Sequence, residues 1–130
     1  MSLTFFITPY PPMSWETAQS TLYIDMEEFH HRLLENWAAA EVQITQKQSL
    51  VWRIPEVESV GFFGSIHANH QIASFSPGNW TIMIDFIRWY RIFINIEYKL
   101  FLFNSVGWES MELTIATTDA DIRSFIFGNS

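Results

Sequence analysis

Two histidines in the stretch "IHANH" are the first side chains in this sequence that could do chemistry. His67 and His70 stand three residues apart, a spacing at which two imidazoles on one helix face can bind a metal ion. The alternation of apolar residues around them, however, predicts a β-hairpin over residues 60–75, with the histidines flanking its turn. No third ligand stands at a recognisable spacing. We therefore expect no metal site and no cofactor.

A second candidate is the stretch "FIRWYR", in which Arg88 and Arg91 stand among aromatic residues. Two guanidinium groups beside aromatic rings can bind a carboxylate or a phosphate. Asp85, three residues before Arg88, offers the alternative of a helix ion pair on a solvent-exposed polar strip that also includes Arg91. We favour the ion pair. As candidate polar groups of a binding site we keep His67, Arg88, Tyr90 and Arg91.

Signatures of covalent catalysis are missing from the sequence. There is no G-x-S-x-G motif and no cysteine, which excludes cysteine nucleophiles and thiolate metal sites. The stretch "GFFGS" lacks the rest of a phosphate-binding loop, so Gly61 and Gly64 indicate a bulge or a close approach of a helix to the sheet. Trp108, in the predicted turn "SVGWE", is a candidate contact residue because tryptophan is enriched at interface hot spots.

Composition narrows the classes of partner. The net charge is −7, and only 16% of the residues are charged against 48% hydrophobic. Nucleic acids and anionic membranes need clustered Lys and Arg, so we expect neither as a partner, and an acidic surface favours a basic one. The N-terminus has no basic segment followed by a long apolar run, and cysteine is absent. We therefore expect a cytoplasmic protein.

The segments that must position these residues show both helix and strand patterns. Met26, Phe29, Leu33 and Trp37 follow the spacing of an amphipathic helix, with Asp25 as its N-cap. Alternating apolar residues bounded by turn residues predict strands. We expect helices over 25–39, 80–94 and 118–127, strands over 50–54, 60–68, 71–75, 98–104 and 111–115, and shorter strands over 41–44 and 4–7.

The most apolar stretch, residues 79–103, raises the question of a membrane span, which needs about 20 apolar residues with few charges. Five charged residues interrupt it: Asp85, Arg88, Arg91, Glu97 and Lys99. Each would be costly in lipid. We therefore expect a helix over 80–94, buried on most of its circumference, followed directly by a strand, and no contact with a membrane.

The order of these elements, with strands in hairpin runs and helices between them, is typical of the α+β class. A chain of 130 residues fits one hydrophobic core. We expect a single domain over residues 1–130, with residues 1–20 as an edge strand or a loose N-terminal arm. An antiparallel sheet of about four to six strands should carry two to three helices, packed mainly on one face.

The stretches "FHHRLLENW", "GSIHANHQIASF", "FIRWYR" and "TTDADI" resemble a family of small bacterial α+β domains of unknown function, over residues 22–127. Some similar acidic domains are immunity proteins that neutralise toxins. The resemblance implies a non-catalytic protein–protein interaction module of the immunity type, whose partner is another protein or, in a homodimer, a second copy. It assigns no functional residues. The alternative is a small-molecule-binding protein or minor enzyme with a pocket between helix 80–94 and the sheet.

Overall fold

The computed structural model describes residues 3–11, 20–56, 59–78, 80–106 and 109–128. Within them the chain forms strands and helices in the order that the sequence predicts. The elements are β1 (Phe5–Thr8), α1 (Met26–Asn36), β2 (Glu41–Ile44), β3 (Leu50–Glu56), β4 (Ser59–Ile66), β5 (Ala73–Ser76), α2 (Trp80–Phe93), β6 (Leu100–Asn104), β7 (Ser110–Leu113) and α3 (Asp119–Phe127).

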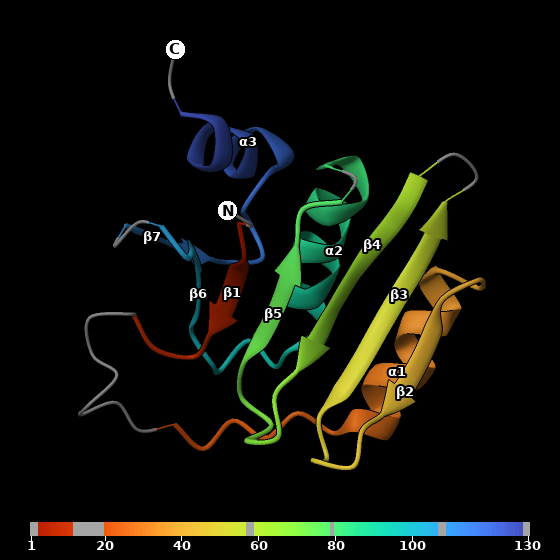
Figure 1. Cartoon of the computed structure of the whole chain (residues 1–130). Helices are drawn as coiled ribbons and strands as arrows, with labels where there is room; N and C mark the ends of the chain where they lie inside the picture. Colours follow the sequence, from red (N-terminus) through yellow and green to blue (C-terminus); the bar gives the residue numbers. More distant parts are fainter. Residues whose placement is uncertain (1–2, 12–19, 57–58, 79, 107–108, 129–130) are drawn as a thin grey trace.

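All seven strands belong to one sheet with the order β2-β3-β4-β5-β1-β6-β7 (Figure 1). Every neighbouring pair is antiparallel. The α+β class and the antiparallel sheet are therefore confirmed, but the sheet has more strands than the four to six expected. The difference arises because both short segments, β1 and β2, pair with neighbouring strands and so add to the sheet.

β1 corrects the expectation of an edge strand or loose arm for residues 1–20. It lies inside the sheet, between β5 and β6, where Phe5 pairs with Phe75 on one side and with Asn104 on the other. Phe5 and Ile7 are buried, so burial of these side chains favours an interior position. Pro9 does not interfere because it follows the last residue of the strand. Residues 12–19 of the expected arm lie outside the described residues.

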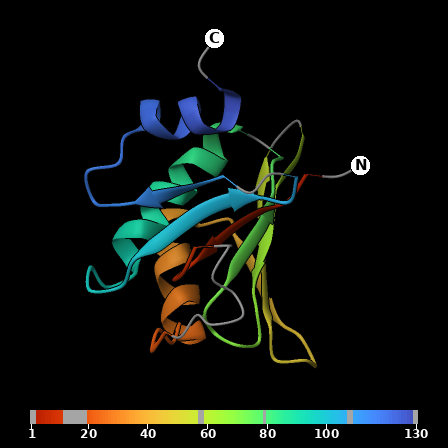
Figure 2. The ribbon, with the colours of Figure 1, turned by 90° about the vertical axis from the view of Figure 1, so that its left-hand side faces the viewer.

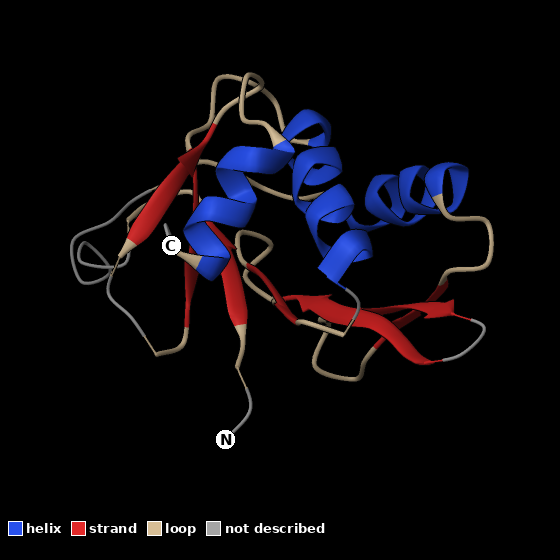
Figure 3. Cartoon of the chain, turned by 90° about the horizontal axis from the view of Figure 1, so that it is seen from above, coloured by secondary structure: helices blue, strands red, loops and turns tan. Residues whose placement is uncertain are grey.

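The helices lie on one face of the sheet. Figure 2 shows the sheet twisting so that β6 and β7 run across the direction of β3 and β4, and Figure 3 shows the sheet bending around the three helices. α2 occupies the middle of this group, as expected for the helix with the most apolar surface. The helix α2 is followed by the strand β6, so the predicted division of this apolar stretch into a helix and a strand is confirmed. No described helix is long and apolar enough to cross a membrane.

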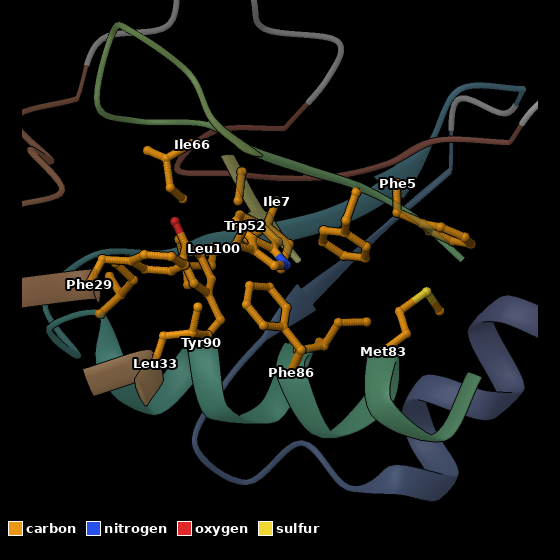
Figure 4. Packing of buried hydrophobic residues seen from close by; sticks show 14 of the residues in the cluster. Phe5, Ile7, Phe29, Leu33, Trp52, Ile66, Met83, Phe86, Tyr90 and Leu100 are labelled. Carbon is orange, nitrogen blue, oxygen red and sulfur yellow. The ribbon is translucent and has the colours of Figure 1, made fainter. Parts of the chain in front are cut away.

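Phe86 is the central side chain of the core. It points from α2 towards the sheet (Figure 4) and stacks on Trp52 of β3, with ring centroids 4.7 Å apart and an angle of 24° between the planes. Its ring also approaches Phe62 at 5.3 Å and Phe75 at 5.6 Å. Burying several aromatic side chains against one another supplies a large share of the hydrophobic stabilisation of a small domain.

Two glycines make this packing possible. Gly64 lies on the helix-facing side of β4, where an added Cβ would stand 2.5 Å from Cζ2 of Trp52 and 2.5 Å from the carbonyl oxygen of Ser74. Gly61 has φ +82°, a conformation that favours glycine, opposite the β-bulge of β3 between Ile54 and Glu56. The sequence-based interpretation of both glycines is confirmed, except that the group packed on Gly64 is a strand residue and not a helix.

Gly64→Ala should reduce the free energy of unfolding by about 1–3 kcal/mol, because the methyl group must displace the Trp52 ring or the β5 backbone. Urea denaturation followed by tryptophan fluorescence would measure this change. The neighbouring variant Phe63→Ala alters an exposed position on the opposite face of the same strand and should cost clearly less. An equal loss in both variants would contradict the packing argument.

Candidate functional site

The predicted polar strip on α2 does not form, because residues spaced three apart drift around a helix. Each such step turns about 60° short of a full circle, so Arg91 lies about 120° from Asp85 around the axis. Asp85 is exposed, whereas Arg91 is only 4% exposed. Nη1 of Arg88 donates to Oδ1 of Asp119 in α3 at 2.9 Å. The predicted Asp85–Arg88 ion pair is therefore wrong, and Arg88 instead connects α2 to α3.

Arg91 is a structural residue that binds backbone carbonyl groups. Nη1 donates to the oxygen of Tyr98 at 2.8 Å, and Nη2 donates to Ile94 at 3.1 Å and Asn95 at 2.9 Å. A longer contact of 3.5 Å reaches the oxygen of Leu113. Burial lowers the pKa of Arg91, but the positive charge lies at the C-terminal end of α2, where the helix dipole favours it. Both Nη groups are thus occupied within the fold, whereas Nε is buried without a hydrogen-bond partner among the described residues.

Tyr90 belongs to the core and not to a pocket. It is fully buried, its ring stacks on Phe86 at 5.7 Å, and its hydroxyl has no hydrogen-bond partner among the described residues. Burial raises the pKa of Tyr90. Side chains fill the space between α2 and the sheet around it (Figure 4), and the cavity beside Arg88 and Arg91 has a volume of only about 20 Å³, room for one water molecule.

His67 lies on the other side of the sheet, facing away from the helices. Nε2 of His67 is 3.0 Å from Oγ of Ser74, which is 3.2 Å from Oγ of Ser65. Burial lowers the pKa of His67. A serine bonded to a histidine resembles an activated nucleophile, but in the described part of the chain no carboxylate orients this imidazole. Trp108, the fifth predicted site residue, lies outside the described residues.

The structure therefore does not bring the predicted site residues together. Arg88 and Arg91 bind groups of the protein itself, Tyr90 is in the core, and His67 is on the opposite face. His70 points away from His67 towards the segment before α1, and no group of three or more possible metal ligands occurs among the residues described. A concave surface elsewhere in the described part of the chain has a different composition and a different place.

That surface is a cleft of about 420 Å³ beside the C-terminal half of α2. Its walls are residues 22–25, the first half of α1, the C-terminal half of α2 and Tyr98. We call it the α2 cleft. Its floor is apolar, because Leu22, Ile24 and Ile94 are buried there, and aromatic side chains stand at its sides. The volume is within the range of about 300–1,000 Å³ that is usual for ligand pockets.

The first wall, the segment before α1, is fastened to the β4–β5 turn. Ile24 donates its N–H to the oxygen of His70 at 2.8 Å, and Nδ1 of His70 lies 2.8 Å from the oxygen of Ile24. The imidazole stacks on Tyr23, with centroids 4.1 Å apart. Gln71 donates from Nε2 to the oxygen of Ser20 at 2.9 Å. These contacts hold Tyr23 at the rim of the cleft, with 68% of its surface exposed.

The second wall comes from α2. Trp89 and Phe93 stack with centroids 5.4 Å apart and planes 10° apart, and both are half-buried. Ile92 lies beside them and is 72% exposed. Tyr98 connects the two walls at one end, because its hydroxyl donates to the oxygen of Thr21 at 3.4 Å. Both walls are thus defined by contacts that exist without a ligand.

Charged groups occur on the α1 side of the cleft. Oδ1 of Asp25 accepts hydrogen bonds from the N–H groups of Glu27 and Glu28, at 3.0 and 3.1 Å, and so caps α1. Oε1 of Glu28 accepts from Nε of Arg32 at 2.8 Å. The carboxylates of Asp25 and Glu28 and the guanidinium of Arg32 together give the lining residues a net charge of −1.

Sequence reasoning missed this site, although one signal for it was present. In "TLYID", the apolar Leu22 and Ile24 alternate with Thr21, Tyr23 and Asp25, the pattern of an extended segment with one buried face. Nothing local, however, indicates that this segment faces the C-terminal end of α2. The arrangement offers a concave, partly aromatic surface for binding and no group placed for covalent chemistry.

Comparison with protein-family models, curated proteins and solved structures finds no match to this chain.

Arg91→Met should lower the free energy of unfolding by about 2–4 kcal/mol, because it leaves buried carbonyl oxygens without donors. The matched variant Arg88→Met on the same helix removes a half-exposed ion pair and should cost less than about 1 kcal/mol. Urea denaturation measures both. If Arg88→Met proved the more damaging, the assignment of Arg91 as the structural arginine would be wrong.

His67 should make the protein less stable as the pH falls. The unfolded chain protonates this histidine around its usual pKa of 6.5, whereas burial resists protonation in the folded state. Protons therefore favour unfolding below that pH, and the contribution levels off once the folded state is protonated too. The loss of stability between about pH 7.5 and 5 should be smaller in His67→Gln than in the wild type. Identical pH profiles would contradict this role.

Proposed function

We propose that this protein is a non-catalytic protein–protein interaction module whose docking surface is the α2 cleft. The observation that carries the proposal is the gathering of large exposed apolar side chains around a concave surface. Tyr23 and Ile92 are 68% and 72% exposed on opposite walls, and Ile96, just beyond α2, is 68% exposed. Single exposed apolar residues are normal, whereas a cluster of them around a cleft is typical of an interaction site.

Burial in the fold does not account for the apolar side chain of Ile92, which is 72% exposed. α2 already buries Met83, Phe86 and Ile87 against the sheet, so Ile92 faces outwards on the opposite side of the helix. On the same outer side, Ile115 is 64% exposed and shares a small cavity with Ile92. Leaving these side chains in water costs free energy that a partner would recover by covering them.

Charge favours a basic partner over a second copy. Each chain carries a net charge of −7, so two copies repel one another while a basic protein is attracted. This preference, with the resemblance to immunity-type domains, supports a role in neutralising a toxin in the cytoplasm of a bacterium. In the second form of the proposal, the partner is another copy of the chain, which binds through the same cleft. We do not propose nucleic acid as a partner.

A small-molecule ligand remains the alternative function, because the cleft volume of about 420 Å³ suits one. Its place is then the α2 cleft and not the predicted pocket around Arg88, Arg91, His67 and Tyr90. A ligand that binds the folded protein raises its melting temperature. A thermal-shift screen of metabolites therefore tests the alternative directly, and a stabilising metabolite whose effect disappears in Ile92→Asp would favour it.

Ile92→Asp should abolish capture of the partner by the protein, since it places a charge among the apolar walls of the cleft. The experiment uses affinity-tagged full-length protein in lysates of the source cell, with bound proteins quantified by mass spectrometry. The control is Ile44→Asp, which makes the same change at another exposed isoleucine, 55% exposed on β2 at the far edge of the sheet.

A supporting result is a protein retained equally by wild type and Ile44→Asp, reduced at least about tenfold by Ile92→Asp, and then shown to bind in purified form. Retention of the same proteins by all three variants would exclude the α2 cleft as the docking surface. Gel filtration of the purified chain distinguishes the homodimer, because a dimer of the wild type should then become a monomer in Ile92→Asp.

A further inference from the structure

We infer that the partner enters the α2 cleft with the cationic side chain of an arginine or a lysine. This inference rests on the proposed function and specifies what the cleft recognises. Its basis is the combination of aromatic faces, free carboxylate oxygens and an apolar floor within one cleft. Each of these matches a different part of a long basic side chain.

The aromatic side chains suit a cation. Tyr23, Trp89, Phe93 and Tyr98 all line the cleft, and a cation over the face of an aromatic ring is attracted by the ring quadrupole. Tyr23 has one ring face covered by the imidazole of His70, and the residue remains 68% exposed. Trp and Tyr are also the better partners for such a contact.

The carboxylates supply the opposite charge. Asp25 uses Oδ1 for both N-cap hydrogen bonds and Glu28 uses Oε1 for Arg32. Oδ2 of Asp25 and Oε2 of Glu28 have no partner among the described residues. A guanidinium or ammonium group at the cleft mouth would therefore meet two free acceptors, and hydrogen bonds between ionised groups are stronger than neutral ones.

The apolar floor suits the stem of the same side chain. Arginine and lysine carry three or four methylene groups that pack on apolar surface while the charged end remains in a polar environment. In the cleft, Leu22, Ile24 and Ile94 form the buried part and the carboxylates stand on the α1 side. A purely apolar side chain would make no use of these carboxylates.

Arg32 is the charged side chain of the lining that opposes a second cation. It stands four residues after Glu28 on α1, and the pair is half exposed, with 57% of Arg32 and 48% of Glu28 accessible. Such an exposed pair is worth little and can exchange partners at low cost. An incoming cation therefore competes with Arg32 for Glu28. Because of this competition, removing the charge of Glu28 and removing that of Arg32 should change the affinity for the cation in opposite directions.

The walls need little rearrangement to receive such a side chain. The contacts of His70 with Tyr23 and Ile24 and of Tyr98 with Thr21 hold the first wall in place, and stacking holds Trp89 on Phe93. A preformed site loses less conformational entropy on binding than a mobile one. Even a single amino-acid derivative should therefore bind measurably.

The test is an NMR titration of the full-length protein with N-acetyl-arginine amide, with its neutral isostere N-acetyl-citrulline amide and with N-acetyl-leucine amide. The arginine derivative should shift the signals of Tyr23, Trp89 and Tyr98 and bind about five- to thirtyfold more tightly than the citrulline derivative, the range of a cation–π contact with partial desolvation. Tetramethylammonium serves as a free cation without an apolar stem.

Two variants of one ion pair provide the matched control. Glu28→Gln and Arg32→Gln break the same contact, so any structural effect of its loss is common to both. Glu28→Gln removes the negative charge of the carboxylate and should weaken binding of the arginine derivative at least about threefold, whereas Arg32→Gln removes a competing cation and should strengthen it by a similar factor. Changes in the same direction in both variants would overturn the inference.

The remaining outcomes separate this inference from the proposed function. Equal affinity for the arginine and citrulline derivatives, or tighter binding of the leucine derivative in the cleft, would contradict the inference that the occupant is cationic. Neither result would contradict the proposal that the cleft is a protein-docking surface. Binding of tetramethylammonium as tight as that of the arginine derivative would assign the cleft to a small organic cation. That result would contradict both the inference of a partner's basic side chain and the proposed protein-docking function of the cleft. Absence of shifts in the cleft with every probe overturns the inference, while the capture experiment with Ile92→Asp still decides the docking surface.

Discussion

The stacking of Phe86 on Trp52 above Gly64 is the contact on which the rest of the structure depends. It sets how closely α2 approaches the sheet, because a side chain at position 64 would occupy the place of the indole. Once α2 is seated, its C-terminal end and its outward-facing residues have fixed positions. The α2 cleft is therefore a consequence of the core, although none of its lining residues takes part in that stack.

Polar groups inside the molecule complete this arrangement. Arg91 joins the C-terminal end of α2 to the residues before β6 and to β7 through backbone carbonyl groups, which ties the helix to one half of the sheet. Arg88 attaches α3 to the same helix from outside. Two arginines that look alike in the sequence thus have unrelated roles, one in a half-exposed ion pair and one buried among carbonyl groups. Burial distinguishes them, since the buried guanidinium depends on backbone carbonyl groups of the protein for its Nη hydrogen bonds.

The elements were largely predictable, because each depends on a local pattern. The spacing of Met26, Phe29 and Leu33 specifies the buried face of α1, and alternation specifies the faces of β3 and β4. The candidate site was not predictable in the same way. Tyr23 and Trp89 are 66 positions apart in the sequence, and no local pattern says that both line one cleft. The prediction of an Asp85–Arg88 ion pair was wrong for a related reason. Arg88 pairs with Asp119, which lies on another helix, and not with its neighbour in sequence.

By itself, the sequence determined the class of the fold, the order of its helices and strands, and the acidic charge that limits the choice of partner. These properties follow from composition and short-range periodicity, which act before the chain is folded. Only the tertiary structure decided that β1 lies inside the sheet, that Arg91 is buried and Arg88 is not, and that an aromatic cleft forms beside α2. Each of these depends on contacts between residues distant along the chain, and such contacts exist only once the core has packed.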